Sequence, residues 1–126
     1  MNRTSAIDAY KREAIENAPP LKLVRMLYEG ALRFLAQARD CDAEDPGSDF
    51  VHWLMRADAI VAELRCSLDR DSGAEVCGDL EQLYRFAETE IARAIQTREL
   101  AHVENARRVL ATLLEGWASI GSEAVG

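Results

Sequence analysis

Apolar side chains recur at helical spacing along four successive stretches of the chain, and this repeated pattern restricts the fold to packed helices. The stretches cover residues 20–38, 50–68, 72–96 and 97–120, and short polar breaks separate them. A recurrence every three or four residues places the apolar groups on one side of a helix, and no stretch shows the alternation typical of strands. Short connections make consecutive helices antiparallel neighbours. The sequence therefore predicts an all-α fold, an antiparallel up-and-down four-helix bundle.

Residues with strong preferences for helix ends mark the expected boundaries. Pro20 suits the first turn of the first long helix, because an N–H at that position has no helical partner in any case. Ser48 follows a Pro-Gly turn and is the expected cap of the second helix. Ser72 and Glu75 have the spacing of a capping box at the start of the third helix, and Gly121 should stop the fourth near residue 120.

The length of 126 residues suits one domain with a single core. We expect an N-terminal arm over residues 1–18, a bundle over residues 19–121 and a tail over residues 122–126. The arm carries only a sparse set of apolar residues, among them Ile7 and Tyr10, at a spacing that would let a short helix lie against a groove. An arm that simply completes the core is the alternative.

The first long helix is apolar around more of its circumference than the other three. Its apolar residues span an arc of about 200°, whereas a surface helix usually shows about 100°. Met26 falls on the otherwise polar side and widens the apolar surface further. The arc consists of Leu21, Leu23, Val24, Leu27, Tyr28, Gly30, Ala31, Leu32, Phe34, Leu35 and Ala38. Because one bundle core cannot cover so wide a surface, we expect part of this helix to bind another protein chain.

Charge and cysteine content narrow the class of protein. The formal net charge of -7 argues against nucleic-acid binding, which depends on clustered Lys and Arg. No apolar run approaches the length of a membrane span, and no signal-peptide core is present. The three cysteines, Cys41, Cys66 and Cys77, form no CxxC pair. We therefore expect a reduced, cytoplasmic protein that binds neither nucleic acid nor membrane.

The residues that could support catalysis or metal binding do not form a convincing set. Glu99 and His102 have the spacing of a di-metal bundle motif, but the nearest second copy is Asp49 with His52, and both pairs fall in expected first turns. No nucleophile has a local signature, and no glycine-rich phosphate loop is present. We expect no catalytic, cofactor or metal site, and hence no enzyme. Phe86 stands alone on the polar side of the third helix.

Several strings, taken in order and spacing, resemble the flagellar secretion chaperone family, the export chaperones of flagellin. They are Ile7-Asp-Ala-Tyr10, the run Leu23-Val-Arg-Met-Leu-Tyr-Glu-Gly-Ala31 followed by Phe34, Ser67-Leu68-Asp69 with Gly73-Ala-Glu75, Leu80-x-x-Leu83-Tyr84, and Trp117. The resemblance implies a cytosolic, non-enzymatic chaperone that binds the disordered C-terminal segment of flagellin. It also implies that the chaperone prevents premature polymerisation and assists delivery to the flagellar type III export apparatus.

The resemblance implies that an arm bearing the residues that match Ile7 and Tyr10 acts as a lid over part of the client groove. The groove itself is assigned to the side of the first long helix that Met26 extends. Its residues would be Leu23, Met26, Leu27 and Phe34. Tyr28, Leu32 and Leu35 would then face the core, and the reverse division is the alternative.

A second function remains open at this point. The wide apolar helix could serve homodimerisation, or regulatory protein binding, in a helical bundle that has no client peptide.

Overall fold

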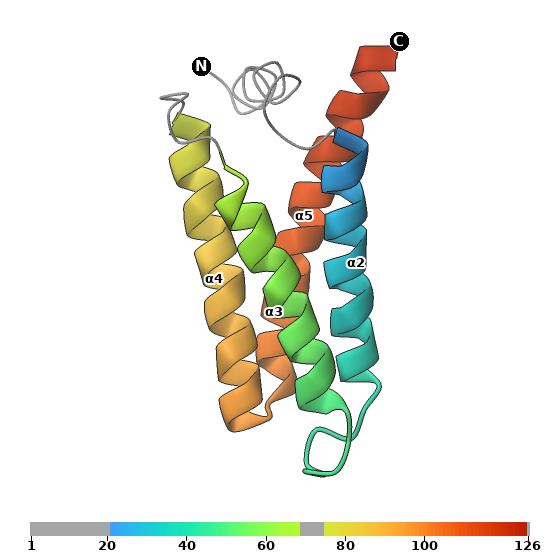
Figure 1. The fold of residues 1–126 in the computed structure, drawn as a ribbon, viewed down its shortest axis with the longest axis vertical. Helices are drawn as coiled ribbons and strands as arrows, with labels where there is room; N and C mark the ends of the chain where they lie inside the picture. Colours follow the sequence, from blue (N-terminus) through green and yellow to red (C-terminus); the bar gives the residue numbers. More distant parts are fainter. Residues whose placement is uncertain (1–20, 69–74, 126) are drawn as a thin grey trace.

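A computed structural model describes residues 21–68 and 75–125 of the chain, which form four long helices. These are α2 (Leu21–Arg39), α3 (Phe50–Cys66), α4 (Glu75–Thr97) and α5 (Leu100–Val125). Figure 1 shows them running up and down side by side. The predicted all-α antiparallel bundle is confirmed. The predicted arm and lid, with Ile7 and Tyr10, lie outside the described residues.

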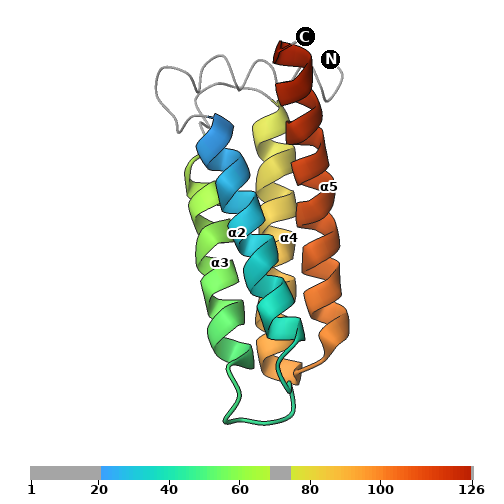
Figure 2. The same cartoon turned by 90° about the vertical axis from the view of Figure 1, so that its right-hand side faces the viewer.

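The helices close into a ring in which each one contacts two neighbours. α2 packs against α3 and α5, and α4 packs against α3 and α5. The view in Figure 2, turned by 90°, shows α2 in front of the gap between α3 and α5. This arrangement gives α2 two edges, one toward α3 and one toward α5, on either side of its buried stripe.

The centre of the bundle is apolar with one hydrogen-bonded aromatic group. Buried side chains come from all four helices, among them Phe50, Leu54, Ile91 and Leu110. The hydroxyls of Tyr28 and Tyr84 are hydrogen-bonded to each other, and Trp117 Nε1 donates to the Tyr28 hydroxyl at 3.1 Å. Buried aromatic side chains with polar tips need such partners. The group therefore ties α2, α4 and α5 together at one level.

Two expected helix ends differ from the observed ones. The N-cap of α3 is Asp49, not Ser48, although Ser48 Oγ accepts a hydrogen bond from the N–H of Phe50 at 3.4 Å. Ser48 Oγ also donates to the carbonyl of Asp42 at 2.7 Å, so the side chain closes the preceding loop. α5 continues past Gly121 to Val125, because glycine weakens a helix by only about 1 kcal/mol relative to alanine.

The two connections at one end of the bundle are joined to each other. Arg98, between α4 and α5, has a φ of 60°, the left-handed conformation that commonly ends a helix. Its N–H donates to the carbonyl of Ala94 at 2.8 Å, and its guanidinium Nη1 donates to the carbonyl of Ala43 in the α2–α3 loop at 3.0 Å. This end of the bundle is thus closed by hydrogen bonds.

Candidate functional site

The predicted groove residues lie along the edge of α2 that faces α3. Leu23 and Met26 are 47% and 54% exposed, whereas Leu27 and Phe34 are half-buried against the core. On the opposite flank, Tyr28 and Leu35 are buried as expected, and Leu32 is half-buried. The structure therefore brings the four groove candidates onto one edge and places their exposed members toward the beginning of α2.

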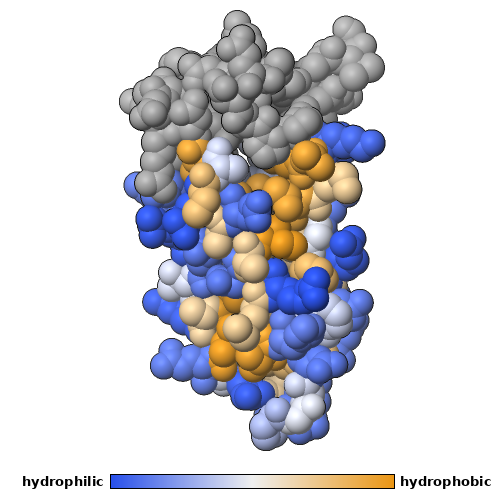
Figure 3. Space-filling view, viewed as in Figure 1, coloured by the Kyte–Doolittle hydropathy of each residue, from blue (hydrophilic) through white to orange (hydrophobic). Residues whose placement is uncertain are grey.

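Gly30 determines how closely α2 approaches α3 along this edge. A Cβ atom built on Gly30 would lie 3.3 Å from Cδ1 of Ile60, a tight contact with an α3 side chain. The absence of a side chain at Gly30 lets Ile60 cover the α2 backbone directly. Toward the beginning of α2 the two helices diverge in Figure 1, and Figure 3 shows apolar residues filling the recess between them. We call this edge, formed by Leu23, Met26, Leu27, Phe34, Trp53 and Ile60, the α2/α3 seam.

Aromatic and basic side chains gather at the other end of the seam. The rings of Phe34 and Trp53 stack with centroids 5.6 Å apart, and His52 meets Trp53 edge-on at 4.9 Å. The guanidinium carbons of Arg33 and Arg56 lie 5.8 and 4.9 Å from the centroid of the Phe34 ring. Such distances are within the range of cation–π attraction.

The outward side of α3 also carries exposed apolar surface. Met55 is exposed on this side. A hollow of about 400 Å³ lies near the end of α3, lined by Ala59, Ala62, Glu63, Cys66 and Ser67. Met55 and Ala59 are both exposed, so α3 has apolar area outside the bundle core.

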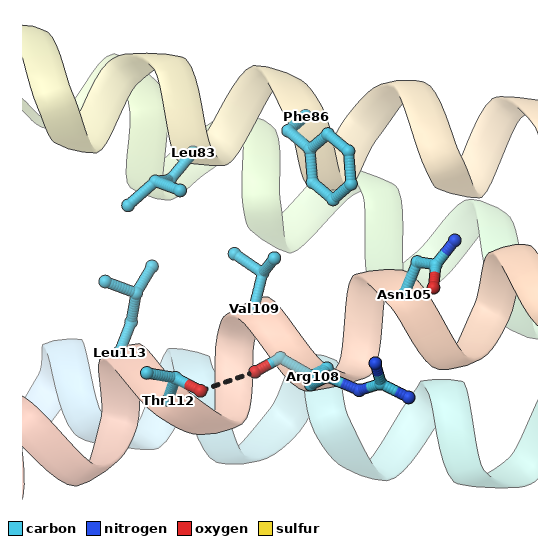
Figure 4. Close-up of a pocket in the computed structure, with 7 residues that line it drawn as sticks. All are labelled: Leu83, Phe86, Asn105, Arg108, Val109, Thr112 and Leu113. Carbon is cyan, nitrogen blue, oxygen red and sulfur yellow. Dashed lines mark hydrogen bonds between the residues drawn. The ribbon is translucent and has the colours of Figure 1, made fainter.

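A second apolar hollow lies between α4 and α5. Figure 4 shows Leu83 and Phe86 of α4 pointing toward Val109 and Leu113 of α5, around a cavity of about 410 Å³. Leu83, Val109 and Leu113 have the helical spacing of core residues, but all three are only half-buried. They lie at the edges of their stripes, where coverage depends on the lateral spacing of the neighbouring helix. Phe86 is therefore part of an apolar lining and does not stand alone.

A buried carboxylate joins α4 to α5, and the sequence had not singled it out. Glu90 is 4% exposed, and it accepts a hydrogen bond from Asn105 Nδ2 at 2.9 Å. Nδ1 of His102 lies 3.1 Å from the same carboxylate, and Arg93 Nη1 lies 3.4 Å away. The hydrogen bond from Asn105, together with the nearby His102 and Arg93, lowers the pKa of Glu90 against the opposing effect of burial.

The described part of the chain shows no further chemistry of the kinds considered above. Within it, no cluster of three or more His, Cys, Asp or Glu side chains could hold a metal ion. His102 Nε2 lies 3.6 Å from a carboxylate oxygen of Glu99, and Asp49 serves as the α3 N-cap. None of the helices in residues 21–68 and 75–125 is long and apolar enough to cross a bilayer. What stands out is surface available for another protein.

Comparison of the sequence with known proteins identifies a family and several relatives. The family described as "Flagellar protein FliS" matches residues 3–124. The flagellar secretion chaperone FliS of Campylobacter jejuni is 34% identical, over 95% of this chain and 94% of its own length. FliSB of Pseudomonas aeruginosa and FliS of Salmonella typhimurium, both named flagellar secretion chaperones, are 27% and 26% identical over at least 95% of either chain.

Proposed function

This chain belongs to the FliS family of flagellar secretion chaperones, which are not enzymes, and from that premise we propose that its client is flagellin. In this proposal it binds the disordered C-terminal segment of flagellin in the cytoplasm, prevents premature polymerisation and assists delivery to the flagellar type III export apparatus. The relatives are named as flagellar secretion chaperones, and the identity of the bound segment is our proposal.

The main support for this proposal is the exposure of Leu23 and Met26 on the α2/α3 seam. Large apolar side chains at this spacing on a helix offer a matching surface to an amphipathic helix. Covering one such side chain stabilises a complex by about 1.5 to 3 kcal/mol when it is fully buried, so two half-exposed side chains contribute roughly half that amount each. A disordered client segment would fold along the seam and lose conformational entropy in doing so.

The lid belongs to the same proposal. Ile7 and Tyr10 would cover part of the seam until the client arrives, and their displacement would offset part of the binding energy. Removal of residues 1–16 should then tighten client binding or leave it unchanged, while it lowers the solubility of the free chaperone. Complete loss of binding after this truncation would show that the arm forms part of the site.

The direct test is calorimetric titration with a peptide of the last roughly 40 residues of flagellin from the same organism, accompanied by circular dichroism. We expect saturable one-to-one binding, a gain in helicity and a negative heat-capacity change. No heat and no helicity gain from well-folded protein would contradict the proposal. If light scattering then showed a tight dimer, homodimerisation through the seam would be the function instead.

A matched pair of variants tests whether the client binds at the seam. Leu23 and Leu100 are 47% and 46% exposed, and Leu100 lies at the opposite end of the bundle, at the start of α5. Leu23→Ser should weaken binding of the peptide about tenfold, whereas Leu100→Ser should leave it unchanged. Equal losses in both variants would place the client elsewhere.

A further inference from the structure

Two arginines at the far end of the seam have no carboxylate partner among the described residues. Arg33 and Arg56 contact the Phe34 ring, and no acidic side chain of that part of the chain lies within ion-pair distance of either guanidinium. Some other arginines are ion-paired: Arg65, Arg85, Arg93 and Arg107 each lie within 3.4 Å of a glutamate oxygen.

The setting of these two arginines contrasts with the net negative charge of the chain. The chain contains 22 acidic and 15 basic residues, so carboxylates are in excess. At the seam, two arginines are held instead over an aromatic ring that is itself stacked on Trp53. The pair forms a local positive site beside an apolar surface on an acidic protein.

The chemistry of the cluster selects one kind of ligand. An aromatic ring contacts the face of a guanidinium, whereas the N–H groups point outward from its edge. The N–H groups therefore remain able to bind both oxygens of a carboxylate. Phe34 and Trp53 offer apolar area next to those donors. We infer that Arg33 and Arg56 recognise an aspartate or glutamate side chain of the client segment, next to an apolar residue that packs against Phe34. This inference rests on the proposed client binding.

The two ends of the seam would then have different roles in client binding. Leu23 and Met26 would supply apolar contact area near the beginning of α2, while Arg33 and Arg56 would determine the register and direction of the bound segment. Charged groups at an interface contribute mainly to specificity and to the association rate. An acidic residue of the client at the wrong position would leave a guanidinium unpaired and an apolar residue misplaced.

The experiment compares two double variants with the same change in net charge, using the flagellin peptide described above. Arg33→Gln/Arg56→Gln should weaken binding about tenfold and remove most of the dependence of Kd on salt concentration. Arg85→Gln/Arg108→Gln alters α4 and α5 instead and should change Kd less than twofold. Equal losses in the two double variants, or no loss in the first, would overturn the inference.

A charge exchange identifies the source of the carboxylate. Arg33→Glu/Arg56→Glu should abolish binding of the wild-type peptide and recover binding of a peptide in which one acidic residue is replaced by lysine. Amidation of the peptide C-terminus should have no effect. A tenfold loss on amidation, or recovery with none of the lysine peptides, would overturn the assignment to an acidic side chain. Failure of wild-type protein to bind the wild-type peptide would instead refute the proposed client.

Discussion

The α2/α3 seam and the α4/α5 hollow are both apolar surfaces between neighbouring antiparallel helices, yet they are built differently. α4 and α5 are joined by the buried carboxylate of Glu90, which contacts His102 and Asn105 of α5. α2 and α3 are joined by apolar contact, with Gly30 against Ile60 and Phe34 on Trp53. A satisfied buried polar group permits only one alignment of its helices, whereas an apolar contact tolerates adjustment. The seam is therefore the better surface for a client that must be bound and released.

Client binding should show the largest difference between the α2/α3 seam and the α4/α5 hollow. Met26 on the seam and Phe86 beside the hollow are 54% and 43% exposed, so each can accept a charge without disrupting the core. Met26→Asp should weaken binding of the flagellin peptide by about 10- to 100-fold, because it places a carboxylate in the apolar contact. Phe86→Asp should change Kd less than twofold. Comparable losses, measured by calorimetry, would show that the client also covers α4 and α5.

The close approach at Gly30 should make the seam sensitive to added volume. Gly30→Leu would drive a side chain into Ile60, and such overpacking costs about 1 to 3 kcal/mol. Urea denaturation should show this loss in the free energy of unfolding. Gly78, also within a helix, has open space around its Cβ position, so Gly78→Leu is the control and should not destabilise the fold. An unchanged Gly30→Leu variant would mean that α2 and α3 separate without cost.

The buried carboxylate should make the α4/α5 pair sensitive to acid. The pKa of Glu90 is lowered in the folded state, so its contribution to stability is present above the unfolded pKa and is lost as the pH falls through the folded pKa. Glu90→Gln should lower the free energy of unfolding by about 1 to 3 kcal/mol at pH 7, because the donors of Asn105 and Arg93 lose a charged acceptor.

The same variant should differ less from wild type after acidification. In acid, as the pH falls through the lowered pKa of Glu90, the wild-type carboxylate takes up a proton, so the gap in unfolding free energy should be smaller than at pH 7. Urea titrations at both pH values measure the change. A gap that stays constant would show that the charge of Glu90 does not stabilise the α4/α5 contact.

Much of the architecture could be predicted because helical periodicity is a local property. The spacing of apolar residues in α3 and α5 indicated the sides that become buried, and Phe50, Leu54 and Leu110 are buried accordingly. The wide apolar arc of α2 likewise indicated that a single core would leave part of it uncovered. Leu23 and Met26 are the uncovered part.

The edges of the stripes could not be resolved in the same way. Leu83 and Val109 have the periodicity of core residues but line an open hollow, because exposure at an edge depends on how far apart two helices stand. The sequence gives no sign that Glu90 is buried, since its partners His102 and Asn105 belong to another helix. Contacts between residues distant in sequence leave no periodic signal.

Helical spacing alone is enough to predict a four-helix bundle with one helix too apolar for its own core, since both properties follow from spacing within single helices. Which edge of that helix stays open, and what lies beside it, depends on how the helices pack. Gly30 lets α3 cover the middle of the edge, and Trp53 and Arg56 of α3 complete the aromatic and basic cluster around Phe34. Each of these features joins two helices, and a surface made by two helices exists only after they have packed.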